Sequence, residues 1–273
     1  MTLQVSARRV RQSLTALSAL LTLVTVGGRA FAQGRGGAPA PAPTTAQSVA
    51  PRDFTGYWMS VVTEDWRWRM VVPIKGDYNS VPVNAEGRRV AGMWDLAKET
   101  KPEDQCKGYG AATIMRVPGR LHITWQDPNT LKVETDSGTQ TKLLHFGGAP
   151  SASEPLQWQG YSVASWEGMP PRVQQGRPST LPPGPPRGYM KVVTTRVLPG
   201  YLRKNGVPYS SNAVVDEYYD RITEPSGDSW LLVTTIVTDP QYLAQPFVTH
   251  GIFKKMPDAT GWDPTPCRAD EAR

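Results

Sequence analysis

The chain has 273 residues, of which 26 are proline and 25 are glycine, and this composition disfavours a bundle of long helices. Its 39% apolar and 20% charged residues are enough for one core of domain size. The formal charge of +6 includes four arginines in the first 32 residues, which contain no acid, so the remaining 26 basic residues face 24 acidic ones. That near balance is not the pattern of a nucleic-acid-binding protein.

The first 32 residues have the three parts of a secretory signal. A basic start is followed by an apolar stretch from Leu14 to Val26 and by Ala30-Phe31-Ala32, so we expect the mature protein to begin at Gln33. The apolar stretch is shorter than the ~20 residues of a membrane span, as is every later one. We therefore expect an exported monomer, in the periplasm or outside the cell, without an integral membrane span. An uncleaved amino-terminal anchor is the alternative.

Two segments have the composition of unstructured chain. Residues 33–52 begin with a glycine-rich run and then alternate Ala and Pro, which favours an extended, disordered leader. Residues 168–188 contain seven prolines and predict a surface insertion between two strands, either a plain loop or a polyproline ligand for a partner.

Between and after these segments the sequence predicts short strands in close succession. The first two are expected at residues 56–63 and 66–72, and a helix at 84–98, where Asn84 can act as the cap and Val90, Met93, Trp94 and Ala97 form one stripe. Strands at 120–126, 130–135 and 139–146 form a meander, because Asp127-Pro128-Asn129-Thr130 and Asp136-Ser137-Gly138-Thr139 favour tight turns. Further strands are expected at 161–167, 189–198, 212–224, 229–238 and 247–255, with a four-residue hairpin turn at 225–228.

About ten strands joined mostly by hairpins predict an all-β protein whose antiparallel sheet closes on itself. A single up-and-down barrel over residues 53–267, with one flanking helix and a tail at 268–273, is the preferred architecture. A two-sheet sandwich is the alternative. Cys106 and Cys267 form an even pair in an exported chain, with no CxxC spacing, and are expected to form one disulfide. Two buried thiols are the alternative.

Few residues suggest chemistry. The turns of the meander place His122 and His145 on opposite faces, and without an HxH, HExxH or Cys/His cluster we expect no metal. There is no GxSxG motif and no phosphate-binding loop, so we expect no cofactor.

The strand at 212–224 carries the best candidate site. Glu217, Tyr219 and Arg221 alternate onto one face, whereas Asp216 and Asp220 lie on the other, where two acids would be costly to bury. We expect the Glu217 row to face the barrel interior, where it would orient a polar group of a ligand or act as an acid and base. A structural role, with Glu217 and Arg221 bound to different neighbours, is the alternative. Candidate ligand-binding residues beside this row are Trp125, His145, Trp230 and Thr234.

Several short motifs occur in an order typical of one protein group. They are residues 54–58 (FTGYW), Cys106 with the glycines that follow, 158–163 (WQGYSV), 205–210 (NGVPYS), Glu217, Asp239-Pro240 and 245–247 (QPF). In this order the chain resembles a large group of uncharacterised, lipocalin-like bacterial secreted proteins. The resemblance implies a calycin-type barrel and brings no substrate with it.

Two functions are therefore expected from the sequence. The first is binding of a small, mostly apolar molecule, aromatic or terpenoid-like, in the barrel lumen. The second is cofactor-independent acid/base catalysis in the same cavity, by an isomerase, cyclase, lyase or hydrolase. A structural or partner-binding module using the proline-rich insertion is a third possibility.

Overall fold

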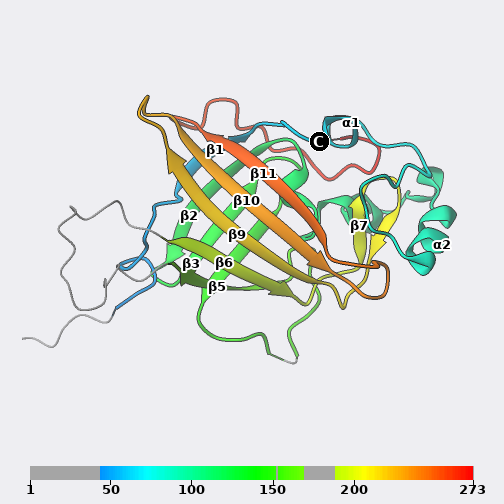
Figure 1. Cartoon of the computed structure of the whole chain (residues 1–273), viewed down its shortest axis with the longest axis horizontal. Coiled ribbons are helices and arrows are strands. Elements are labelled where there is room, and N and C mark those ends of the chain that lie inside the picture. The colour runs from blue at the N-terminus through cyan, green and yellow to red at the C-terminus, as the bar shows by residue number, and fades with distance from the viewer. Residues whose placement is uncertain (1–43, 152, 169–187, 273) are drawn as a thin grey trace, which may run out of the picture. The chain divides into compact units, whose positions relative to one another are not determined.

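The computed structural model describes residues 44–151, 153–168 and 188–272. The expected signal peptide, the first part of the leader and nearly all of the proline-rich insertion lie outside these residues. Nine of the strands close into a barrel with the order β1-β11-β10-β9-β6-β5-β4-β3-β2 (Figure 1). Because the sheet is closed, the sandwich alternative does not apply.

The barrel strands are short, and most begin or end within a residue or two of the expected positions. They are β1 (Gly56–Ser60), β2 (Arg120–Asp127), β3 (Thr130–Thr135), β4 (Thr141–Phe146), β5 (Tyr161–Glu167), β6 (Tyr189–Thr195), β9 (Val214–Thr223), β10 (Ser229–Thr238) and β11 (Phe247–Lys255). A separate hairpin, β7 (Gly200–Arg203) and β8 (Val207–Tyr209), was not expected. The sequence contains a turn signal for this hairpin, the dipeptide Asn205-Gly206. In the structure Gly206 has a φ of 84°, which favours glycine.

The topology is not purely up-and-down. All neighbouring strands are antiparallel except β4 and β5, which run parallel. Parallel neighbours need a crossover rather than a hairpin, and residues 147–160 provide it. The hairpin β7-β8 also leaves the barrel between β6 and β9, which pair with each other. The barrel prediction and the meander of β2, β3 and β4 are confirmed, whereas the purely up-and-down order of the whole barrel is not.

One-residue differences in register change which side chains point inward. A tight turn at 127–130 predicts that Gln126 lies opposite Leu131, but Trp125 occupies that position because the pairing shifts between Trp125 and Asp127. His122 and His145 therefore both lie on the outer face, where they stack on Tyr57 and Tyr161. The expectation that they point to opposite sides was wrong, since a slip of one residue reverses the faces of a strand.

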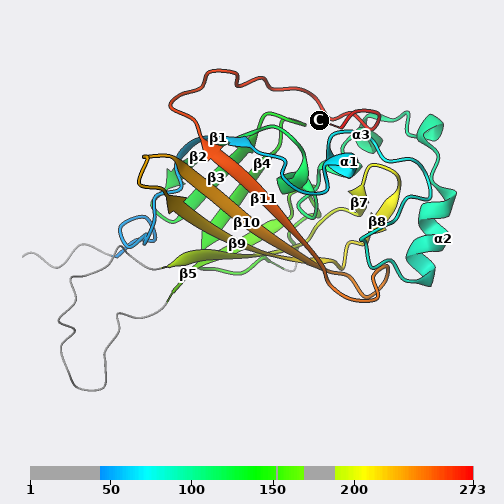
Figure 2. The ribbon, with the colours of Figure 1, turned by 45° about the horizontal axis from the view of Figure 1, so that its top comes forward.

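The α-helices and 3₁₀ helices are short and lie outside the barrel wall. They are α1 (Trp66–Arg69), α2 (Ala85–Met93), η1 (Leu96–Lys98), α3 (Pro102–Gln105), η2 (Lys107–Tyr109) and η3 (Ile114–Arg116). Figure 2 shows α2 and the β7-β8 hairpin beyond one end of the barrel. These elements cover that end of the barrel (Figure 2).

Two of these helices differ from expectation. Residues 66–72 were expected as a strand, but Asp65, with a φ of 51°, turns the chain and its carbonyl accepts from the amides of Trp68 and Arg69. The expected helix 84–98 begins at its Asn84 cap as predicted, yet it ends at Met93. Met93 is 60% exposed, and the buried α2 residues are Gly87 and Ala91 rather than the expected apolar stripe.

The folded part begins earlier than residue 53. Residues 44–52 were expected to belong to the disordered leader, but they contact the β2-β3 turn and the end of β5. The amide of Ala46 donates to Asn129, and its carbonyl accepts from the Trp166 indole. Arg52 donates to the carbonyl of Gly188. This segment therefore covers one end of the barrel.

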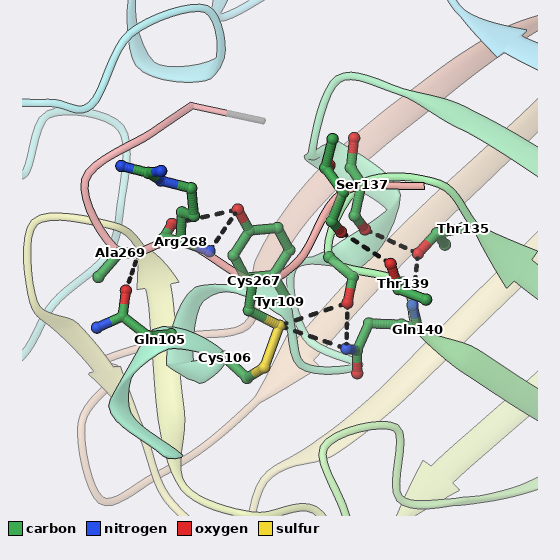
Figure 3. The surroundings of a disulfide bond; sticks show 12 residues. Gln105, Cys106, Tyr109, Thr135, Ser137, Thr139, Gln140, Cys267, Arg268 and Ala269 are labelled. Carbon is green, nitrogen blue, oxygen red and sulfur yellow. Dashed lines mark hydrogen bonds between the residues drawn. A yellow bond between two sulfur atoms is a disulfide. The ribbon is translucent and has the colours of Figure 1, made fainter. Parts of the chain in front are cut away.

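The expected disulfide is confirmed. Cys106 and Cys267 are joined across 161 positions of sequence (Figure 3). Next to the bridge, Tyr109 donates its hydroxyl to the carbonyl of Arg268, and Gln105 accepts from the amide of Ala269 (Figure 3). The bridge thus fixes the carboxy-terminal segment to the body. None of the helices formed by the described residues has the length and apolar character needed to cross a membrane.

Candidate functional site

The Glu217 row points into the barrel. Glu217 and Tyr219 are 0% exposed, and they alternate with Asp216 and Asp220, which are half-buried on the outer face. Asp220 forms an ion pair with Arg52 at 3.1 Å. Asp216 and Asp220 thus lie on the outer face, as expected, and the carboxylate of Glu217 lies in the core.

The charge partner of Glu217 is Lys142 from β4, not Arg221. Lys142 and Glu217 form an ion pair inside the barrel, and the Tyr219 hydroxyl donates to the same Glu217 oxygen at 3.4 Å. Sequence reasoning missed Lys142, although it alternates with Leu144 and Phe146 and so belongs to the apolar face of its strand. We call Lys142, Glu217 and Tyr219 the interior triad.

The interior triad is closed to solvent. Burial and the neighbouring Glu217 carboxylate raise the pKa of Tyr219 well above its ordinary value, so the phenol keeps its proton. Glu217 Oε1 and the facing Thr235 Oγ1 have no hydrogen-bond partner among the described residues. A buried ion pair with such neighbours is costly to break, and no ligand atom reaches it in this conformation.

The middle of the barrel is filled with side chains rather than hollow. Inward residues with no exposed surface surround the triad: Trp58, Ile123, Leu144, Met190, Val192 and Leu231. A side chain without exposed surface borders no water-sized void, and such an interior has the packing of an ordinary core. The expected binding cavity in the middle of the lumen is therefore absent from the part of the barrel that these residues line.

Aromatic rings gather at one end of this filled interior. Trp125, Phe146 and Trp166 point inward from β2, β4 and β5, and Phe54 stacks on Trp166 at 6.0 Å between ring centroids. Phe146 lies 4.6 Å from Trp166 and 5.6 Å from Trp125. Three of the four rings are only partly buried. We call these four residues the aromatic mouth.

Positive charge lies on the other side of the same barrel end. Arg221 and Lys255 both lie over the ring of Trp58, at 5.8 and 4.5 Å, and Arg221 donates to the carbonyl of Asp53. Arg221 Nε is buried and has no partner among the described residues. Burial and the nearby Arg221 charge lower the pKa of Lys255. This end of the barrel thus combines apolar rings with a buried N–H group, that of Arg221 Nε, which has no hydrogen-bond acceptor among the described residues.

The residues expected to bind a ligand are not brought together. Trp125 belongs to the aromatic mouth, whereas His145, Trp230 and Thr234 lie on the outer face. For Trp230 and Thr234 the cause is the β9-β10 hairpin, in which Thr223 rather than Glu224 pairs with Ser229. This places Thr235 and Val233 inside, opposite Glu217 and Tyr219. Thr234 instead shares a hydrogen bond with His250, and Trp230 lies beneath Lys254.

The described part of the chain contains no group of three or more His, Cys, Asp or Glu side chains arranged to hold a metal ion. No protein-family model, curated protein or solved structure matches this chain.

Proposed function

We propose that this protein is an exported, lipocalin-like barrel that binds a small, mostly apolar organic molecule, aromatic or terpenoid-like, at the aromatic mouth. The observation that carries the proposal is the convergence of Trp125, Phe146 and Trp166 from three separate strands at one end of an otherwise filled barrel. Flat, partly exposed indole and phenyl faces bind apolar ring systems with a large buried area for few ordered side chains.

The ligand seat is the mouth rather than the middle of the lumen. The middle offers no space beside the interior triad, whereas the mouth aromatics retain exposed surface. Residues 44–52 cover this end, so a ligand enters by displacing them or by sliding beneath them. Arg221 Nε is buried, so it donates to a polar group of the ligand only after the segment that ends at Asp53 is displaced.

Binding is favoured over acid/base catalysis by the position of Glu217. A general acid or base must come within hydrogen-bond reach of its substrate, and Glu217 is fully buried in its pair with Lys142. The interior triad is better explained as a polar cross-link between β4 and β9.

Export is supported by the secretory signal expected at residues 1–32 and by the disulfide. A structural disulfide persists in oxidising compartments and is rare in the cytosol. The order of short motifs shared with lipocalin-like secreted proteins supports the same location.

Titration with the neutral probe N-phenyl-1-naphthylamine tests the binding proposal. Its fluorescence rises in an apolar site, and energy transfer from nearby tryptophans reports closeness to the mouth. We expect saturable binding by the wild type and a loss of about tenfold or more in affinity for Trp166→Ala and Phe146→Ala.

Trp66→Ala is the matched control, because Trp66 is 67% exposed and lies outside the barrel. This variant should bind the probe as the wild type does. Equal binding by all variants, or a loss confined to Trp66→Ala, would contradict the proposal. Urea unfolding of each variant separates loss of binding from loss of fold.

A further inference from the structure

The barrel end opposite the aromatic mouth holds three buried arginines, two of which have no counterion among the described residues. Arg69 of α1 and Arg203 of β7 are 4% and 3% exposed, and Arg116 of η3 is 6% exposed. All three line one small cavity of about 30 Å³, together with Trp68 and Leu202. We call this the arginine cavity.

The hydrogen bonds of these arginines leave donors free. Arg69 donates Nε to the carbonyl of Arg116 at 2.9 Å, but its Nη1 and Nη2 are buried and have no partner among the described residues. Arg203 donates Nη2 to Ser80 at 2.8 Å, and its Nε and Nη1 are likewise unpartnered. Four guanidinium nitrogens are therefore desolvated and unsatisfied around one cavity.

Two of the nearby acids are already engaged, and a third, Glu64, acts by its charge against the lowering of the Arg69 pKa by burial, without forming an ion pair with Arg69. Asp65 pairs with Arg116 at 2.7 Å, and Asp77 pairs with Arg67 at 2.6 Å. Among the described residues, neither Arg69 nor Arg203 has a carboxylate within ion-pair distance. Since a buried, unpaired charge is costly, the arginine cavity lacks one negative group.

The arginines keep their charge despite burial. Burial and the repulsion of Arg116 lower the pKa of Arg69 and of Arg203 to about 10 in each case. Both remain cationic at neutral pH. Arg203 is held by stacking on Trp68 at 4.4 Å, which fixes the plane of its guanidinium. A fixed guanidinium fork is the geometry that recognises oxyanions.

We propose that the arginine cavity binds a small oxyanion, a phosphate, sulfate or carboxylate group, between Arg69, Arg116 and Arg203. The volume suits such a group, since ~10–15 Å³ is enough for one water molecule. The cavity lies close to the surface, since Val71, one of its lining residues, is 56% exposed. The anion is either a free ion or the head group of a larger molecule.

Thermal unfolding and isothermal calorimetry test the proposal, with phosphate, sulfate or acetate replacing chloride at constant ionic strength. We expect at least one of these anions to raise the melting temperature and to bind at one site. A phosphate or sulfate preference indicates a tetrahedral group, and an acetate preference indicates a carboxylate. No binding by any of the three would overturn the proposal.

Arg203→Gln and Arg69→Gln should lose the anion-dependent shift, yet gain stability without the anion, because each removes a buried charge. Arg203→Lys should keep the charge but lose about tenfold in affinity, since it loses the fork. Arg88→Gln, an exposed position on α2, is the control and should respond as the wild type does. Equal anion responses in Arg88→Gln and Arg203→Gln would show non-specific binding and overturn the proposal.

This site is independent of the aromatic mouth. N-phenyl-1-naphthylamine is neutral, so its binding should not change in Arg203→Gln. Failure of either proposal is thus distinguishable from failure of the other.

Discussion

Lys142 and Glu217 stabilise the barrel only as a pair. Removing one partner by Lys142→Met or Glu217→Leu leaves the other charge buried, and we expect each single variant to lower the free energy of unfolding by about 3–5 kcal/mol. The double variant replaces the pair with apolar groups and should recover most of that loss. Urea unfolding of the four proteins gives the coupling. Additive single effects would show that the two residues do not act together.

Lys204 links stability to pH. Burial lowers its pKa to about 7, although Glu271 and Asp270 oppose that shift. In the unfolded chain the pKa is near its ordinary value of 10.5, so between these values the unfolded state binds more protons. The free energy of unfolding should therefore rise with pH from about 7 to 9.5, by at most ~1.4 kcal/mol per unit.

The measurement for Lys204 is urea unfolding across that pH range, with Lys204→Met as the comparison. The variant should lack the part of the slope that Lys204 supplies. Parallel slopes in the two proteins would exclude a buried, proton-losing Lys204. Above pH 10 the trend should reverse, because burial raises the pKa of Tyr109 to about 12 and the unfolded chain then loses protons first.

At the scale of elements, the sequence predicted most strands because turn residues punctuate alternating segments. β3, β5, β10 and β11 have the expected bounds. The strand predicted at residues 66–72 was wrong, because Trp66-Arg67-Trp68-Arg69 alternates apolar and charged residues as a strand does. In the structure, the left-handed backbone of Asp65 precedes a short helix, which the alternation does not indicate. The exact length of the turns was the other feature that could not be predicted from the sequence. A shift of one residue in each of two hairpins decided whether His145 and Thr234 point inward or outward.

The candidate site was therefore only half predictable. Alternation alone placed Glu217 and Tyr219 inside, because it does not depend on register with other strands. The partner of Glu217 depends on which strands face each other across the barrel. The contact between the side chains of Lys142 on β4 and Glu217 on β9 forms only because the sheet closes with one parallel pair of strands. Local sequence does not encode that topology.

The disulfide ties two elements that are far apart in sequence. Replacing both cysteines by serine should lower the free energy of unfolding by about 4–5 kcal/mol in the chain-entropy model, because the bridge closes a very long loop. Reduction of the wild type should reproduce that loss. Thiol titration of the denatured, unreduced protein should find almost no free thiol. Two titratable thiols, or an unchanged unfolding midpoint after reduction, would contradict this account.

Residues 169–187 can be replaced by a short loop without loss of the barrel. Glu167 and Tyr189 are directly paired neighbours on β5 and β6, so a hairpin turn can join the two strands. We expect an Asn-Gly replacement to leave the urea midpoint unchanged. A large fall would show that the segment contributes to the stability of the folded unit.

At the scale of the whole molecule, the barrel is a filled scaffold whose two ends differ chemically. One end presents the aromatic mouth beneath residues 44–52, and the other is closed by α1, η3 and the β7-β8 hairpin around the arginine cavity. The filled interior separates the two ends, so a ligand at one end makes no contact at the other. Both proposals therefore concern the ends of the barrel.

The most direct test of a binding site at the aromatic mouth is a nuclear magnetic resonance titration of ¹⁵N-labelled protein with N-phenyl-1-naphthylamine. The titration is followed at the tryptophan indole signals. Single Trp→Phe variants assign the signals. We expect the indole signals of Trp125 and Trp166 to shift with one saturating curve, while that of Trp230 on the outer face stays in place. Unmoved Trp125 and Trp166 signals, or a Trp230 signal that shifts instead, would contradict a binding site at the aromatic mouth.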